Sequence, residues 1–268
     1  MSPRWPTRLL ACLCVLCPSS APSAFAQADP AAGGAAADKA AAAADKEAAK
    51  AEAKKHKEEV DAAIAAFKKG LKGDAAAQAS AVGELKAAKD DKLIAMLAPL
   101  LCSGPVEVRE AACSALAEYK GMGKSTPKAA AALAGGLGPN KKNESVLVSI
   151  LSALGDLEDE SQLAVLHKSM EEQETGVARA ATAATGRIRS RNSIDVLIAA
   201  AKKLERGKSD VQFAAGGVSL GNAGNDRYDA LFSPTLDALK TITGQDLPDS
   251  KAWEAWWKQN KGTFKVSK

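Results

Sequence analysis

Apolar residues recur at helical spacing along most of the chain, and residues 146–166 show this pattern most clearly. Their sequence, VLVSILSALGDLEDESQLAVL, contains an apolar run, the acidic segment 155–159 and the start of a second apolar run. Apolar positions three and four residues apart predict amphipathic helices. The pattern therefore predicts a helix, an acidic turn at residues 155–159 and a second helix.

Related segments occur before and after this unit. Aligned on their first alanine, five copies begin at Ala81, Ala115, Ala153, Ala184 and Ala238. They are 34, 38, 31 and 54 residues apart, and spacings of about 30 to 45 are typical of helical-hairpin repeats. A single helix pair of that size cannot bury its apolar face alone, so we expect neighbouring pairs to stack.

Helix boundaries follow from capping residues. We expect Asp91 to cap a helix over residues 92–102, with Pro99 producing a kink. Pro105 would take the first position of the next helix. Asp159 and Gln162 have the spacing of a capping box that opens a further helix.

Two segments carry a family resemblance. Residues 108–116, beginning Val108-Arg109-Glu110-Ala111-Ala112, and residues 153–159 resemble HEAT and HEAT-like repeats, with a V-R-x-A-A-x-A-L helix followed by a G-D turn. The resemblance covers residues 57–205, with a final repeat over residues 232–262. It implies an all-α fold, an α-solenoid of about four to five antiparallel helical hairpins that binds other proteins.

The first 26 residues have the features of a signal peptide. Arg4 and Arg8 precede the apolar segment 9–17, and small residues lead to a cleavage site between Ala26 and Gln27. The apolar segment is shorter than the roughly 20 residues that span a bilayer. We therefore expect an exported, periplasmic or secreted protein without a transmembrane segment in the mature chain. A retained membrane anchor and lipid attachment at Cys12 are the alternatives.

Residues 27–56 form a low-complexity linker or exposed helix rich in alanine, lysine and glutamate. Opposite charges at helical spacing favour a helix, but no apolar stripe larger than alanine precedes Val60. The segment is interpreted either as a spacer or as a solvated helix without a role of its own. His56 lies in this charged run, and we expect it to be exposed.

The period is interrupted at residues 206–231, a glycine-rich insertion. It lacks the G-x-x-x-x-G-K-[ST] pattern of a phosphate-binding loop and has no strand before it. A partner-contacting loop and a merely permissive insertion remain as interpretations. The helix predicted over residues 251–260 carries Trp253, Trp256 and Trp257 on one face. That face is interpreted as a cap on the open end of the core, or as a partner-binding patch with Trp256.

Charge and cysteine content narrow the function. The formal charge is +4 and falls to +2 without the signal peptide, so no general case for nucleic-acid binding arises. Cys102 and Cys113 remain in the mature chain. Their expected offset along a hairpin disfavours a disulfide, and we expect two buried small side chains instead.

Motifs give little indication of catalysis or metal binding. Residues 27–268 contain no H-E-x-x-H or C-x-x-C pattern, and we expect no cofactor. Residues 217–221 match G-x-S-x-G, but they lie in the glycine-rich insertion, which has no strand before it. Arg187, Arg189 and Arg191 form a local basic cluster, interpreted as a contact for an acidic partner or as a solvated turn.

The sequence therefore predicts an exported, non-catalytic HEAT-repeat scaffold. We expect the second helices to form its binding face, including Glu107, Glu110, Ser114 and Ser149. One alternative is a HEAT-like enzyme or enzyme subunit of the lyase or glycosylase type. The other is a structural envelope spacer in which the N-terminal Ala/Lys-rich helix matters more than the repeats.

Overall fold

A computed structural model describes residues 34–214 and 223–266, and all regular secondary structure in these ranges is helical. The all-α fold class is therefore confirmed. The α-helices are α1 Gly34–Gly70, α2 Ala75–Glu84, α3 Asp91–Leu100, α4 Val106–Ala117, α5 Ser125–Leu137, α6 Glu144–Leu157, α7 Leu163–Ser169, α8 Thr175–Ile188, α9 Ile194–Ala214, α10 Ala223–Thr243 and α11 Ser250–Asn260. Short 3-10 helices are η1 Leu85–Ala87, η2 Glu160–Gln162 and η3 Arg191–Ser193.

Contacts divide the chain into residues 1–52 and residues 53–268. The described part of the first unit is the N-terminal portion of α1, and its side chains over residues 45–52 are exposed. The side chains of residues 53–59, in the second unit, are exposed as well, and His56 is among them. The first buried side chain among the residues whose burial is described is Val60, followed one and two turns later by half-buried Ile64 and buried Phe67.

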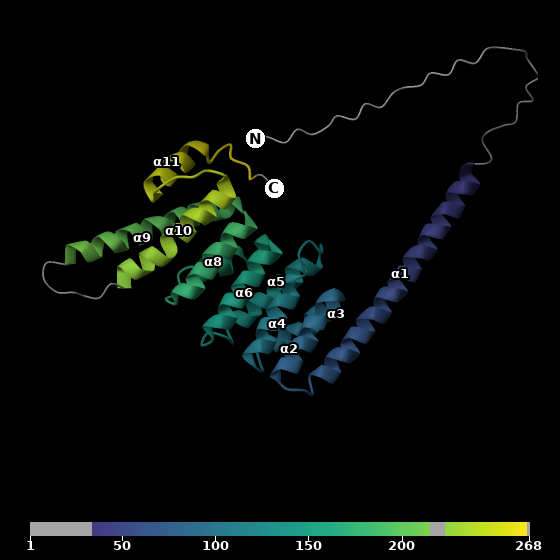
Figure 1. Cartoon of the computed structure of the whole chain (residues 1–268). Coiled ribbons are helices and arrows are strands. Elements are labelled where there is room, and N and C mark those ends of the chain that lie inside the picture. Colours follow the sequence, from purple (N-terminus) through teal and green to yellow (C-terminus); the bar gives the residue numbers. More distant parts are fainter. Residues whose placement is uncertain (1–33, 215–222, 267–268) are drawn as a thin grey trace, which may run out of the picture. The chain divides into compact units, whose positions relative to one another are not determined.

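In the second unit, alternate helices pack against one another in chain order: α2 against α4, α4 against α6, α6 against α8 and α8 against α10 (Figure 1). Another set of contacts joins α3 to α5 and α9 to α11. One hydrophobic core runs through these helices, from Val60 in α1 to Trp257 in α11. It is built mainly from leucine, alanine and other aliphatic side chains.

Gly155 and Gly186 allow close approaches between helices. A Cβ atom at Gly155 of α6 would lie 2.7 Å from the Cα of Ala184 in α8. A Cβ atom at Gly186 of α8 would lie 3.0 Å from the Cα of Ala238 in α10. The glycine of one sequence copy thus packs on the first alanine of the next copy.

The turn after α6 recurs after α8. Glu158 and Arg189, 31 residues apart, both end their helices in the left-handed conformation, at φ 53° and 52°. The next residue in each case accepts a hydrogen bond from a backbone N–H two positions on: Asp159 from Ser161 and Ser190 from Asn192. Each turn then opens a short 3-10 helix, η2 or η3.

Buried Asn140 joins three neighbouring segments. Its Nδ2 donates hydrogen bonds to the carbonyl oxygens of Leu101 and Gly136, each at 2.7 Å, and its Oδ1 accepts from Arg109 Nη1 at 2.8 Å. Both polar atoms of this buried side chain are therefore engaged, in three hydrogen bonds, with the ends of α3 and α5 and with α4. The last carbonyl groups of a helix have no hydrogen-bond partner within the helix. Asn140 supplies a donor to such carbonyls at the ends of α3 and α5.

Several predicted boundaries are wrong. Asp90, not Asp91, caps α3, by accepting from the backbone N–H of Lys92 at 2.8 Å. Pro105 is the residue before α4 rather than its first residue. Residues 155–157 are the last residues of α6 rather than a turn, and Gln162 bonds Ser161 instead of completing a capping box.

The glycine-rich insertion is mostly helical where it is described. α9 continues to Ala214 and α10 begins at Ala223, so both helices extend into residues 206–231. Residues that were expected to interrupt the repeat thus extend α9 and α10. Residues 215–222 of the insertion and the cleavage site between Ala26 and Gln27 lie outside the described residues.

Candidate functional site

A polar groove crosses the second helices of three successive pairs, α4, α6 and α8. Its volume is about 580 Å³. The groove is lined by Glu110, Cys113, Ser114, Ala117, Glu118, Lys120, Ser149, Ser152, Ala153, Asp156, Glu158 and Arg187. We call it the α4–α6–α8 groove.

Two short stripes of small and polar residues form its walls. On α4 the stripe is Glu110, Cys113, Ser114 and Ala117, and on α6 it is Ser149, Ser152, Ala153 and Asp156. Spacings of three, four and seven residues put each stripe on one helix face. Small side chains along both stripes leave space between α4 and α6.

The position of glycine explains where the groove opens. At the α6–α8 contact, Gly155 brings the two backbones together at Ala184. In the aligned copy before it, the corresponding residue of α4 is Ala117, which lines the groove together with Ala153. The groove therefore lies between the pair of helices that lacks this glycine.

Charges of both signs line the groove, with four carboxylates and two cations. Lys120 Nζ lies 2.6 Å from Glu158 Oε1, and Arg187 Nε lies 3.3 Å from Asp156 Oδ1. Arg187 also donates a hydrogen bond from Nη2 to the carbonyl of Ser152 at 3.0 Å. These contacts fix both cations against the walls.

The remaining carboxylates are less constrained. Glu118 pairs with Lys89 at 3.7 Å, between half-exposed side chains, and such pairs contribute little free energy. Within the described part of the chain, Glu110 forms no ion pair or hydrogen bond. The Glu110 end of the groove thus offers an acceptor for a cationic group.

Cys113 lies at the floor of the groove. Burial, and secondarily the negative charge of Glu110, raises the pKa of its thiol to about 12. The thiol is therefore protonated at neutral pH and is a poor nucleophile, which gives the groove no cysteine chemistry. Cys102 is exposed and both cysteines are free, so the expectation that both are buried is wrong for Cys102.

The three predicted arginines do not share partners. Arg187 lies in the groove, whereas Arg189 is exposed at the left-handed end of α8. Arg191 donates to the carbonyl of Lys261 and lies 5.8 Å from the ring centroid of Trp257. Only Arg187 belongs to the groove, and Arg191 instead attaches η3 to the end of α11.

The predicted tryptophan face packs inward. Trp253 and Trp257 are buried, and Trp256 is half-buried against the core. Trp257 donates from Nε1 to Asp195 Oδ1 at 2.8 Å, and Lys261 pairs with the same carboxylate at 2.9 Å. Burial alone would raise the pKa of Asp195, but the hydrogen bonds from Lys261 and Trp257 outweigh it and lower that pKa.

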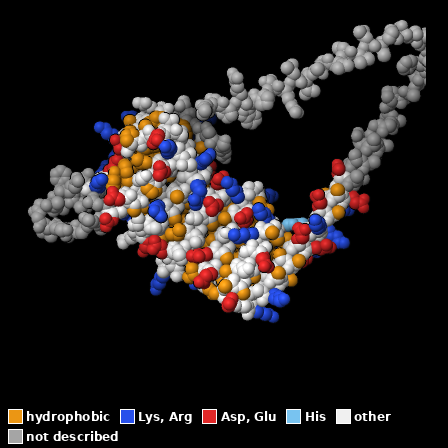
Figure 2. Space-filling model, in the orientation of Figure 1, with side chains coloured by type: hydrophobic (Ala, Val, Ile, Leu, Met, Phe, Trp, Pro, Cys, Tyr) orange, Lys and Arg blue, Asp and Glu red, His pale blue; other side chains and the backbone are white. Residues whose placement is uncertain are grey.

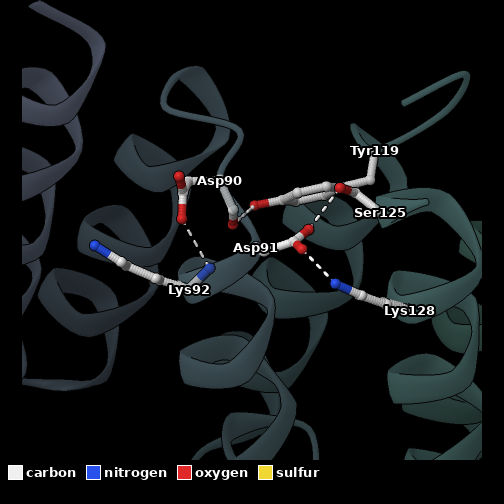
Figure 3. Close-up of polar contacts among 6 residues, drawn as sticks. All are labelled: Asp90, Asp91, Lys92, Tyr119, Ser125 and Lys128. Carbon is white, nitrogen blue, oxygen red and sulfur yellow. Dashed lines mark hydrogen bonds and ion pairs between the residues drawn. The ribbon is translucent and has the colours of Figure 1, made fainter. Parts of the chain in front are cut away.

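A second polar cluster lies at the start of α3 (Figure 3). Asp91 accepts a hydrogen bond from Ser125 Oγ at 2.5 Å and pairs with Lys128 Nζ. Tyr119 donates from its hydroxyl to the carbonyl of Asp90 at 2.8 Å. Figure 3 shows these side chains converging from α3, the end of α4 and α5, so this cluster connects helices.

The sequence pointed to part of the groove. Glu110, Ser114 and Ser149 were expected on the second-helix face and line it, whereas Glu107 does not. Lys120, Ser152, Asp156 and Glu158 were missed. The three-and-four spacing of small and polar residues on α6 was the signal that could have found Ser152 and Asp156.

No group of three or more His, Cys, Asp or Glu side chains among residues 34–214 and 223–266 could hold a metal ion. Within the same residues, no helix combines the length and apolarity needed to cross a bilayer. On the face shown in Figure 2, acidic and basic side chains are interspersed rather than segregated.

Comparisons of the chain with protein-family models, with curated proteins and with solved structures found no match.

Proposed function

We propose that this chain is an exported, non-catalytic scaffold built as an α-solenoid of HEAT-like hairpins, and that it holds a protein partner in the α4–α6–α8 groove. The carrying observation is the groove itself, formed by second helices of consecutive pairs. Ordered packing of α2, α4, α6, α8 and α10 supports the solenoid interpretation. The recurrence of one turn geometry at Glu158 and Arg189 supports it as well.

The chemistry of the groove favours a polar segment of a partner that carries a lysine or arginine. Glu110 supplies the uncompensated carboxylate, and Ser149 supplies a hydroxyl on the opposite wall. Lys120 is paired with Glu158, and Arg187 with Asp156 and a backbone carbonyl. Because both cations are already paired, they attract an acidic group of the partner only weakly.

Two substitutions in the groove and one control test this proposal. Glu110→Lys and Ser149→Arg should abolish co-purification of a partner from the envelope fraction, whereas Glu107→Lys on the same helix should leave it unchanged. Glu107 is exposed and lies outside the groove lining. Equal recovery of every protein by all three variants, or recovery of general chaperones alone, would count against the groove as the binding surface.

Export is proposed from the first 26 residues. The expected mature N-terminus is Gln27, and mass analysis of the protein from the envelope or medium measures it directly. A protein retaining Met1 in the cytoplasmic fraction would contradict this part of the proposal.

A spacer role is a second candidate, favoured by the exposure of residues 45–59 of α1. A helix of 37 residues spans about 55 Å at about 1.5 Å per residue. Deleting residues 38–52 leaves the buried part of α1 in place. An unchanged location and partner set after this deletion would exclude the spacer role.

A further inference from the structure

A separate, more apolar cavity of about 390 Å³ lies among α7, α8, α9 and α10. It is lined by His167, Met170, Glu171, Thr182, Val196, Ala199, Ala200, Lys203, Leu204, Gly207, Arg227, Leu231 and Thr235. We call it the α7–α10 cavity. None of these residues lines the α4–α6–α8 groove.

The short length of α7 accounts for this space. α7 has seven residues, whereas the preceding first helix α5 has 13 and the following one, α9, has 21. After α7 ends at Ser169, buried Met170 and the residues that follow it leave the wall of α9 uncovered. The cavity fills the place that a longer α7 would occupy.

The interior of the cavity offers few hydrogen-bond donors. Thr182 and Thr235 are buried, and their hydroxyls donate within their own helices, to the carbonyls of Ala178 at 2.9 Å and Leu231 at 2.7 Å. Leu231 is itself buried in the wall. An apolar chain could therefore occupy the interior without leaving a buried donor unpaired.

The polar groups around the cavity carry a positive balance. Arg227 donates hydrogen bonds to the backbone carbonyls of Gln173 and Glu172 at 3.0 and 2.8 Å, which fix its guanidinium. A guanidinium has five N–H donors, so others remain to bind a ligand. Lys203 is exposed and forms no ion pair within the described residues. Glu171 is the only carboxylate in the described lining.

His167 does not change this balance at neutral pH. Burial lowers the pKa of its imidazole, and its Nε2 lies 3.0 Å from Ser193 Oγ. The imidazole is therefore neutral at pH 7, and the cations around the cavity are Lys203 and Arg227.

We propose that the α7–α10 cavity binds a medium-chain carboxylate, with its alkyl chain in the cavity and its carboxylate between Lys203 and Arg227. Ligand pockets commonly measure about 300 to 1,000 Å³ and combine apolar walls with a few polar groups. A cavity of about 150 Å³ accommodates benzene, or roughly 25 Å³ per carbon. By that measure a ten-carbon chain needs about 250 Å³, so the cavity of about 390 Å³ also has room for its head group.

Titration calorimetry of the full chain with decanoate tests the proposal. We expect one site that binds decanoate and binds the neutral decan-1-ol at least about tenfold more weakly. Lys203→Gln should weaken decanoate binding about tenfold, the effect of losing one charged hydrogen bond. Lys202→Gln is the matched control, since Lys202 pairs with Glu254 and does not line the cavity.

Filling the cavity gives an independent measurement. Ala199→Trp places a large side chain at an exposed lining position and should abolish binding. Ala164→Trp makes the same change at an exposed position in the neighbouring hollow between α5 and α7, and should leave binding intact. Circular dichroism checks that both variants remain helical.

Absence of saturable decanoate binding would overturn the proposal. So would equal affinity for decan-1-ol, equal weakening by Lys202→Gln and Lys203→Gln, or equal loss in both tryptophan variants. None of these outcomes bears on protein capture by the α4–α6–α8 groove, which is tested by different residues.

Discussion

Substituting alanine for Gly155 should destabilise the protein, even though alanine is the better helix former. The new Cβ would lie 2.7 Å from the Cα and 2.8 Å from the Cβ of Ala184, and 2.8 Å from Arg187 Nε. Two of these atoms belong to a helix rather than to a flexible side-chain end, so α8 itself would have to move.

The size of the effect follows from two opposing contributions. Overpacking of this kind costs about 1 to 3 kcal/mol. Replacing glycine by alanine inside a helix returns about 1 kcal/mol. Because the clash involves backbone, we expect the upper part of the range and a net loss of about 1 to 2 kcal/mol in the free energy of unfolding.

Gly83 provides a matched control, since it occupies the same position in an aligned copy of the repeat. A Cβ atom at Gly83 would meet nothing within 4 Å, so Gly83→Ala should stabilise by about 0.5 to 1 kcal/mol. For a protein of this size about 1 kcal/mol shifts the melting temperature by about 2 to 4 °C. The two variants should therefore melt about 3 to 12 °C apart, on opposite sides of the parent.

Thermal unfolding followed by circular dichroism at 222 nm measures this difference. If Gly155→Ala raised the melting temperature as much as Gly83→Ala does, the close approach of α6 and α8 would be refuted. A lower melting temperature for both variants would instead show that a Cβ atom at Gly83 also meets neighbouring atoms.

Three further substitutions or measurements address other parts of the chain. Asn140→Leu should cost about 3 kcal/mol in urea denaturation, because two buried carbonyls and a guanidinium lose their partner. The lowered pKa of Asp195 adds stability that is present above the unfolded-state pKa of about 3.9 and is lost as pH falls. Tryptophan fluorescence should therefore report loosening around Trp257 below about pH 4. Asp195→Asn should remove that fluorescence change. Thiol labelling followed by peptide mapping should modify Cys102 quickly and Cys113 only in denaturant, and equal rates in the native protein would contradict the burial of Cys113.

The helices were predictable because their signals are local. Apolar spacing in residues 146–166 and the aligned alanines predicted helices, and α6, α7 and α8 occupy these segments. Boundaries depended on more than local sequence. Either Asp90 or Asp91 could cap α3, and the choice reflects contacts of Asp91 with Ser125 and Lys128, more than 30 residues away.

The groove could be predicted only in part. Its polar residues repeat at helical spacing, which identified Glu110, Ser114 and Ser149, but its width depends on how closely α4 and α6 approach. That distance is set by contacts between distant parts of the chain. The α7–α10 cavity likewise lies where α7 ends early, and the sequence predicted a helix there without its length.

The uneven distribution of the interhelical glycines has a mechanical consequence. Where Gly155 and Gly186 bring backbones together, α6, α8 and α10 should respond to load as one stiff block. At the junction of α4 and α6, small side chains face each other across a groove, so bending strain should concentrate there. Pulling or twisting the helix row would then widen or narrow the groove, so the affinity for the proposed partner would vary with the applied force.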